Sequence, residues 1–143
     1  MERKTGILSD HSAQSLVEQL EMREGLTVLI LNPPPDYESM LGTLPKKIHF
    51  KKRPSPNLDF IHFFTESRGG LAAEILMLKQ SISPTGSLWI SWPTVSVGRN
   101  SDLSESFVRD IGRKNGLVDA KTCSLNGRWS AMKLIVAPDE REP

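Results

Sequence analysis

The residues with the most informative chemistry form a turn, Asn32-Pro33-Pro34-Pro35, directly after the apolar run Thr27-Val28-Leu29-Ile30-Leu31. In nucleotide-binding α/β folds the turn after such a strand is rich in glycine, because free backbone N–H groups bind phosphate and the missing side chains let the ligand approach. Proline has no backbone N–H. The turn therefore predicts a nucleotide-binding type of fold that has lost its usual cofactor chemistry, and we expect no cofactor.

Other residue types capable of catalysis lack the partners that they would need. The histidines His11, His49 and His62 have no metal-ligand spacing, and His62 lies in an apolar run where a hydrogen-bonded core histidine is favoured over a general base. Ser91 ends a predicted strand but lacks the Gly-x-Ser-x-Gly turn of acyl-transfer enzymes. A single cysteine, Cys123, excludes an internal disulfide. We assign no catalytic residue and no metal site.

A run of basic residues is the second feature with possible binding chemistry. Five positive charges fall within eight residues: Lys46, Lys47, Lys51, Lys52 and Arg53. Such a cluster could attract phosphate or an RNA backbone, with Lys47, Lys51 and Arg53 as the candidate anion-binding residues. We favour a solvated edge strand whose lysines prevent pairing with other strands. No aromatic residue alternates with the charges on the basic face, which disfavours nucleic acid as a partner.

The length and composition indicate one ordinary globular domain. The chain has 143 residues, 38% hydrophobic and 24% charged, with a net charge of +1, which favours neither nucleic acid nor acidic substrates. The run 26–31, apolar except for Thr27, is too short to span a membrane, and the first residues lead into no signal peptide. We expect a cytoplasmic protein without membrane contact: a single domain over 1–143, with a loose N-terminus at 1–9, a core over about 12–137 and a charged tail at 138–143.

The elements that would position these residues follow from hydrophobic periodicity and turn signals. The run 58–64 is almost continuously apolar, as in a parallel strand covered on both faces. Asp102-Leu103-Ser104-Glu105 has the form of a capping box with Asp102 as the cap. Asn126-Gly127 is a strong hairpin signal. The predicted order is helix 12–23, strand 27–32, helix 36–41, strands 46–52 and 58–64, helix 67–81, strand 86–92, a helix from Asp102 to Gly116, and strands 117–125 and 128–137. This order predicts a three-layer α/β fold, mostly parallel with a C-terminal antiparallel hairpin.

The segment from Gly25 to Asn32 resembles the first strand of the class I S-adenosylmethionine-dependent methyltransferases. That family has an acidic residue at the position of Ile30 and glycines at those of Asn32 and Pro34. It also has an acidic residue at the end of the second strand, which binds the ribose, whereas this chain reads Phe50-Lys51-Lys52-Arg53. The resemblance implies a methyltransferase-like, Rossmann-type sheet, and the differences imply that the cofactor does not bind.

A closer resemblance is to a bacterial family of small domains of unknown function that have this methyltransferase-like fold. It covers about residues 20–137, and its most specific motifs are Ser91-Trp92-Pro93 and Trp129-Ser130. It extends to Leu31-Asn32-Pro33, Tyr37, Leu41-Gly42, Leu88-Trp89-Ile90, Asp102-Leu103, Gly116-Leu117-Val118-Asp119-Ala120-Lys121 and Ala131-Met132-Lys133. Thr94 departs from it, because relatives tend to carry lysine there. No established activity comes with this resemblance.

Ligands of open α/β sheets bind beyond the carboxyl ends of the strands. The candidate ligand groove is therefore bordered by Asn32, Tyr37, Glu66, Ser91, Trp92 and Pro93. Trp92 and Trp129 could line such a groove, although packing is favoured. Three functions stay open. The preferred one is a binding or regulatory module without working cofactor chemistry, with a protein or small-molecule partner. The others are an enzyme or small-molecule binder with a non-standard pocket at the strand ends, and phosphate or nucleic-acid binding through 46–53.

Overall fold

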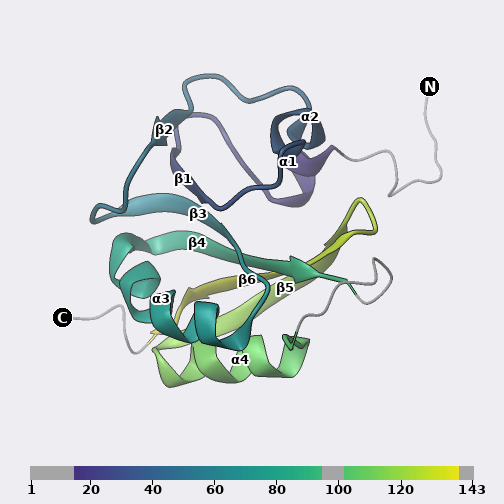
Figure 1. Ribbon diagram of the computed structural model, residues 1–143. Coiled ribbons are helices and arrows are strands. Elements are labelled where there is room, and N and C mark those ends of the chain that lie inside the picture. Colours follow the sequence, from purple (N-terminus) through teal and green to yellow (C-terminus); the bar gives the residue numbers. More distant parts are fainter. Residues whose placement is uncertain (1–14, 95–101, 139–143) are drawn as a thin grey trace.

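The computed structural model describes residues 15–94 and 102–138, so the expected loose N-terminus and most of the expected charged tail lie outside the described residues. The elements occur in the predicted order (Figure 1). They are α1 (Leu16–Gln19), β1 (Thr27–Leu31), α2 (Tyr37–Leu41), β2 (His49–Lys51), β3 (Leu58–Phe64), α3 (Arg68–Ser81), β4 (Ile82–Pro93), α4 (Glu105–Lys114), β5 (Leu117–Leu125) and β6 (Trp129–Val136).

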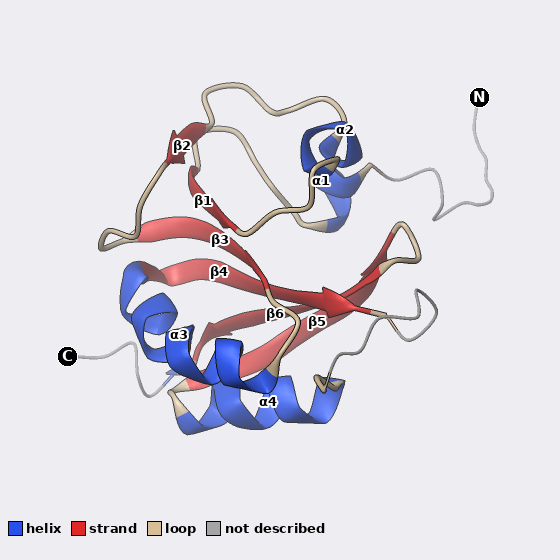
Figure 2. Cartoon of the chain, viewed as in Figure 1, coloured by secondary structure: helices blue, strands red, loops and turns tan. Residues whose placement is uncertain are grey.

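The strands form one six-stranded sheet in the order β2-β1-β3-β4-β6-β5. The first four are parallel, whereas β6 is antiparallel to both β4 and β5. Helices α1 and α2 lie on one side of the sheet, and α3 and α4 lie on the other (Figure 2). The predicted three-layer, mostly parallel sheet with a C-terminal hairpin is confirmed. Among the described residues, no helix is long and apolar enough to cross a membrane.

Two apolar clusters fill the space on the two faces of the sheet. Ile61 and Phe63 of β3 belong to the cluster that includes the buried residues of α3 and α4. Phe60 and Phe64 belong to the cluster that includes those of α1 and α2. Because successive side chains of a strand alternate between faces, β3 has to be apolar on both, as its sequence predicted.

Helix α1 is shorter at its C-terminus than predicted. Ser15 begins it with a capping box, in which the Ser15 side chain accepts from the Glu18 N–H and the Glu18 side chain accepts from the Ser15 N–H. The helix ends before Glu21, which has a left-handed backbone (φ 61°), so Gly25 does not close it as expected. Positions 12–14 of the predicted helix lie outside the described residues.

Strand β4 begins four residues before the predicted start and follows α3 directly. Its pairing with β3 shifts register between Leu58 and Phe60. At this irregularity a Cβ on Gly86 would lie 2.9 Å from the carbonyl oxygens of Leu58 and Asp59. A glycine inside a strand often marks such a close approach between backbones. β4 therefore begins at Ile82, and Gly86 marks the point after which its pairing with β3 becomes regular.

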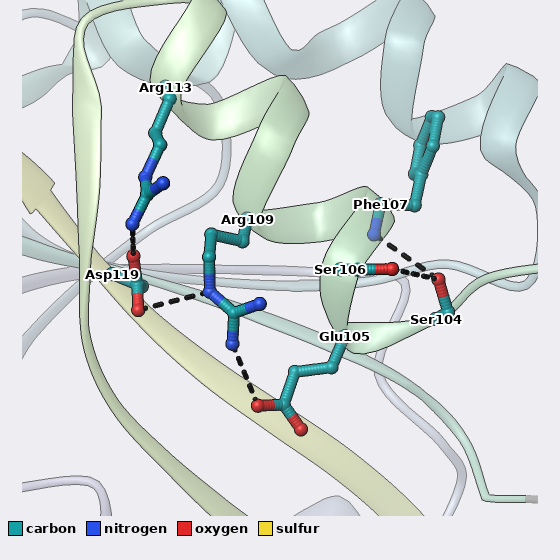
Figure 3. A network of polar contacts seen from close by, with 7 residues as sticks. All are labelled: Ser104, Glu105, Ser106, Phe107, Arg109, Arg113 and Asp119. Carbon is teal, nitrogen blue, oxygen red and sulfur yellow. Dashed lines mark hydrogen bonds and ion pairs between the residues drawn. The ribbon is translucent and has the colours of Figure 1, made fainter.

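The predicted cap of α4 is wrong. Ser104 is the N-cap, and its Oγ accepts a hydrogen bond from the Phe107 N–H at 3.2 Å (Figure 3). Asp102 instead accepts the backbone N–H of Arg68 through Oδ1 at 2.7 Å, and its carbonyl oxygen accepts Arg68 Nε at 2.6 Å. Both Asp and Ser are good caps, so their types alone could not decide which residue begins the helix. Asp102 thus joins the loop before α4 to the start of α3.

Two arginines of α4 hold this helix against β5. Arg109 Nε and Arg113 Nη2 each lie 3.3 Å from a carboxylate oxygen of Asp119, and Arg109 also pairs with Glu105 at 2.9 Å (Figure 3). Gly116 follows the helix with φ 82°, and β5 then begins. This network anchors the hairpin side of the sheet.

The hairpin itself has the predicted turn. Asn126 and Gly127 both have positive φ, 55° and 66°, and the Arg128 N–H donates to the Leu125 carbonyl at 3.0 Å. These are the features of a two-residue type I′ turn. The hairpin leaves β5 at one edge of the sheet, while β2 forms the other edge.

Candidate functional site

The carboxyl ends of the parallel strands surround a small cavity of about 260 Å³. Its walls come from three strands and the turns after them. Asn32 follows β1, Thr65 and Glu66 follow β3, and Trp129 begins β6 opposite the last residue of β4. The lining is Asn32, Phe64, Thr65, Glu66 and Trp129. The cavity thus combines an amide, a hydroxyl and a carboxylate with two aromatic walls.

The turn after β1 is fixed by a side-chain contact. Asn32 has a left-handed backbone (φ 57°), which asparagine tolerates better than most residues, and its Nδ2 donates to the carbonyl oxygen of Phe64 at 3.3 Å. Three prolines follow, and the Tyr37 N–H donates to the Pro34 carbonyl at 3.1 Å as α2 begins. Between Asn32 and Asp36 the chain therefore carries no backbone N–H that could bind an anion.

A buried chain of hydrogen bonds lies beneath the strand ends. The Tyr37 hydroxyl is 2.8 Å from Nδ1 of His62, and His62 Nε2 is 2.7 Å from the Ser91 hydroxyl. His62 and Ser91 have no exposed surface, and Tyr37 is also buried. These hydrogen bonds connect α2 to β3 and β3 to β4, through residues that are 25 and 29 positions apart in the sequence.

The spacing of Ser91, His62 and Tyr37 resembles that of a nucleophile, a general base and a group that orients the base. Three observations argue against catalysis. Ser91 is inaccessible to a substrate. Burial lowers the pKa of His62 to about 3, so its imidazole is a weak base. Burial also raises the pKa of Tyr37 above its ordinary value, and a neutral phenol cannot balance an imidazolium as a carboxylate does. We assign the hydrogen bonds that join Tyr37, His62 and Ser91 a structural role.

Phe64 lies between the buried hydrogen bonds of His62 and the cavity. Its ring stacks on His62 with centroids 4.2 Å apart, and it meets Tyr37 and Trp129 edge-on at 5.4 and 4.9 Å. Such edge-to-face contacts between aromatic rings add specific packing energy to the burial of their surfaces. The cavity floor is therefore a fixed aromatic layer.

The structure brings together only part of the groove predicted from the sequence. Asn32 and Glu66 line the cavity. Tyr37 and Ser91 meet through His62 beneath the cavity. Trp92 packs in the cluster with α3 and α4, on the opposite face from Phe64. Pro93 is buried and lies opposite Trp129 in the register.

Sequence reasoning did not single out Phe64 or Thr65, and it favoured Trp129 as a packing residue. One signal could have placed Trp129. The hairpin strand that pairs antiparallel with β4 has to begin beside the carboxyl end of β4, so its first residue, Trp129, lies at the same edge as Asn32.

The candidate anion-binding residues Lys47, Lys51 and Arg53 lie on or beside β2. Their side chains, like those of Lys46 and Lys52, are exposed, and within the described ranges no ion pair involves any of them. The described residues also include no group of three or more His, Cys, Asp or Glu that could hold a metal ion.

A larger cavity of about 780 Å³ lies next to β2, between this strand and α2. Its lining is largely apolar: Ile30, Pro33, Pro34, Pro35, Tyr37, Glu38, Leu41, Gly42, Leu44 and Phe50. The three prolines thus form one wall of this cavity. We call the whole cavity the proline groove.

A third cavity, of about 400 Å³, lies on the α3 side of the strand ends. It is lined by Leu31, Asn32, Pro54, Phe63, Thr65, Gly70, Ala73, Glu74 and Met77. Asn32 and Thr65 therefore border this cavity as well as the small one.

No family model and no curated protein matches this sequence. Solved structures do match. A SAM-dependent methyltransferase from Aquifex aeolicus has a TM-score of 0.56 at 17% identity, covering 84% of this chain and 87% of that one. The complex of DhpI with SAH has a TM-score of 0.59 at 12% identity, covering 87% and 83%.

A third match is magnesium protoporphyrin IX methyltransferase (ChlM) from Synechocystis PCC 6803 with bound SAH. Its TM-score is 0.53 at 11% identity, covering 85% of this chain and 78% of that one. Identities this low are evidence for the fold alone. Together with the strand order, they show that this chain has a methyltransferase-like α/β fold of the Rossmann type.

Proposed function

We propose that this domain has the methyltransferase-like fold without S-adenosylmethionine chemistry and acts as a binding or regulatory module. The observation that carries the proposal is the turn after β1. Asn32 donates its side-chain N–H to the Phe64 carbonyl, and the three following residues have no N–H. A cofactor that approaches this turn would find neither the glycines nor the backbone donors that such a fold normally offers.

The end of β2 supports the same proposal. In cofactor-binding relatives of this fold, an acidic residue there accepts hydrogen bonds from the ribose. Here β2 ends at Lys51, and Lys52 and Arg53 follow. A lysine or an arginine donates hydrogen bonds and accepts none, so it cannot replace that contact. Two independent cofactor contacts are therefore missing on neighbouring strands.

A second candidate is a small-molecule binder that uses the cavity at the strand ends. The polar groups of Asn32, Thr65 and Glu66 converge there beside Trp129. Ligand sites commonly combine a few convergent polar groups with aromatic walls. The cavity of about 260 Å³ is smaller than the range of roughly 300 to 1,000 Å³ in which most ligand pockets fall. A compact polar molecule is thus the expected ligand class of this alternative.

A thermal-shift screen tests the proposal and separates the two candidates. S-adenosylmethionine and S-adenosylhomocysteine at millimolar concentration should leave the melting temperature unchanged. A compact metabolite that raises it in the parent protein, but not in Glu66→Gln or Trp129→Phe, would establish the second candidate. Stabilisation by either cofactor would contradict the proposal.

A further inference from the structure

We propose that the open edge of β2, together with the proline groove, binds an acidic segment of a partner protein as an added β-strand. This inference extends the proposed binding role and names its partner class. It does not depend on the cofactor, so failure of peptide binding and an observed binding of S-adenosylmethionine would be separate results.

The backbone of β2 is available on one side. This strand pairs with β1 and with no other described strand. The His49 N–H donates to the Leu26 carbonyl at 2.9 Å, so the backbone groups of His49 point toward β1. Backbone groups alternate along an extended strand, which directs those of Phe50 to the open side. An added strand could pair with them, as in the β-augmentation used by peptide-binding domains.

The proline groove lies where the side chains of such a strand would fall. Phe50 is opposite Val28 in the register, and Val28 packs in the cluster with α1 and α2, so Phe50 projects from that face of the sheet. Phe50 is 49% exposed and Leu44 is 42% exposed, and both line the groove. Every second residue of an added strand would face the same side as Phe50. Apolar residues at those positions would cover this surface.

The charges around the edge select the partner. The five basic side chains from Lys46 to Arg53 are exposed, and the groove lining includes one acidic residue, Glu38. Opposite charges on neighbouring strands attract, and like charges repel. A second copy of this chain would bring the same lysines to the interface, so the charges that prevent self-pairing favour an acidic strand. The expected segment alternates acidic and apolar residues.

The groove favours a peptide over a nucleic acid. Single-stranded nucleic acids bind to basic grooves that carry a series of aromatic side chains for base stacking. The groove has two aromatic residues, and one of them, Tyr37, is buried with its hydroxyl bonded to His62. Its other walls are largely proline and leucine, which contribute apolar surface and few hydrogen-bond donors.

The test uses an end-blocked, fluorescent peptide of about eight residues in which glutamate and leucine alternate, a length that spans a typical strand. Its binding is measured by anisotropy at physiological salt with the full chain. We expect saturable binding that weakens at least about tenfold in Phe50→Glu and in Lys51→Glu, a loss of about 1.4 kcal/mol. Leu76→Glu, at a similarly exposed residue on α3, and Lys114→Glu, at an exposed residue on α4, are matched controls and should bind as the parent does.

Two backbone-modified peptides test the added strand itself. N-methylation of alternate residues removes the N–H groups along one edge of the peptide and leaves its side chains in place. One of the two possible sets should abolish binding, and the other should preserve it. Equal binding of both sets, or unchanged binding to Phe50→Glu, would overturn the proposal. So would a single-stranded RNA that binds more tightly than the peptide through the same residues, or a dimer that buries the β2 edge of the parent protein.

Discussion

The imidazole of His62 on β3 lies 2.7 Å from the Ser91 hydroxyl on β4 through Nε2, and 2.8 Å from the Tyr37 hydroxyl through Nδ1. Both neighbours are buried, so loss of one hydroxyl leaves a ring nitrogen unpaired in the interior. We expect Tyr37→Phe and Ser91→Ala each to lower the free energy of unfolding by about 1 to 3 kcal/mol. Urea unfolding measures this.

A double-mutant cycle of Tyr37 and Ser91 should show coupling, because the two hydroxyls bind one imidazole. The exposed Ser39, whose hydroxyl donates to the Asp36 carbonyl, is the control, and Ser39→Ala should change stability by less than about 0.5 kcal/mol. Strictly additive effects of Tyr37→Phe and Ser91→Ala would show that His62 does not connect the two residues.

The depressed pKa of His62 gives stability a definite pH dependence. Burial lowers this pKa from 6.5 to about 3, so below pH 6.5 the unfolded chain binds a proton that the folded chain excludes. The contribution of His62 to stability is complete above pH 6.5 and is lost as the pH falls toward 3, at up to about 1.4 kcal/mol per pH unit.

In this window His62→Gln should show a shallower decline of the free energy of unfolding with falling pH than the parent protein does. Urea unfolding at a series of pH values measures the slopes. Equal slopes in His62→Gln and the parent protein would mean that the imidazole is accessible to protons in the folded state.

The alternation of strands and helices could be predicted because it depends on local periodicity. The run 58–64 is apolar on both faces and became the central strand β3, and Asn126-Gly127 became the hairpin turn. Helix ends were less predictable, since Asp102 and Ser104 are equally good caps and a contact with Arg68 in another helix decided between them. Tertiary contacts of this kind leave no periodic signal.

Some residues of the candidate site could be predicted from the sequence, but the hydrogen bonds beneath it could not. Asn32 and Glu66 follow strands whose carboxyl ends meet at one edge, which their positions in the sequence indicated. The hydrogen bonds of His62 join residues 25 and 29 positions away. The register between β3 and β4 brings Ser91 to His62, and the packing of α2 against the sheet brings Tyr37 there. The sequence favoured an edge strand around 46–53, and β2 lies at an edge of the sheet, but the sequence analysis did not single out Phe50 as an exposed apolar residue.

Gly86 should tolerate no side chain. A Cβ there would lie 2.9 Å from two backbone carbonyl oxygens, which cannot move aside as a flexible side chain can. We expect Gly86→Ala to lower the free energy of unfolding by about 1 to 3 kcal/mol. Gly69→Ala is the matched control, because nothing lies within 4 Å of its Cβ position in α3, and it should be neutral or slightly stabilising. Thermal unfolding of the two variants compares them, and equal melting temperatures would contradict the close approach.

The turn of the hairpin should depend on the backbone of Gly127. Its φ of 66° is strained for a β-branched residue and tolerated by asparagine. We expect Gly127→Val to destabilise the protein by roughly 1 kcal/mol or more, and Gly127→Asn by less. Nothing lies within 4 Å of the Cβ position, so a clash cannot account for the difference. An unchanged melting temperature in Gly127→Val would count against the strained turn.

Isothermal titration calorimetry with S-adenosylhomocysteine tests the central claim most directly, because this product lacks the labile methyl group and probes binding alone. A ligand present at a hundred times its dissociation constant stabilises a protein by about 2.7 kcal/mol, which is a shift of several degrees for a domain of this size. A methyltransferase known to bind the ligand is the positive control. The account predicts no saturable heat up to millimolar ligand, since Asn32 and three prolines replace the glycine turn. Saturable binding at one site per chain, with a matching rise in melting temperature, would contradict it.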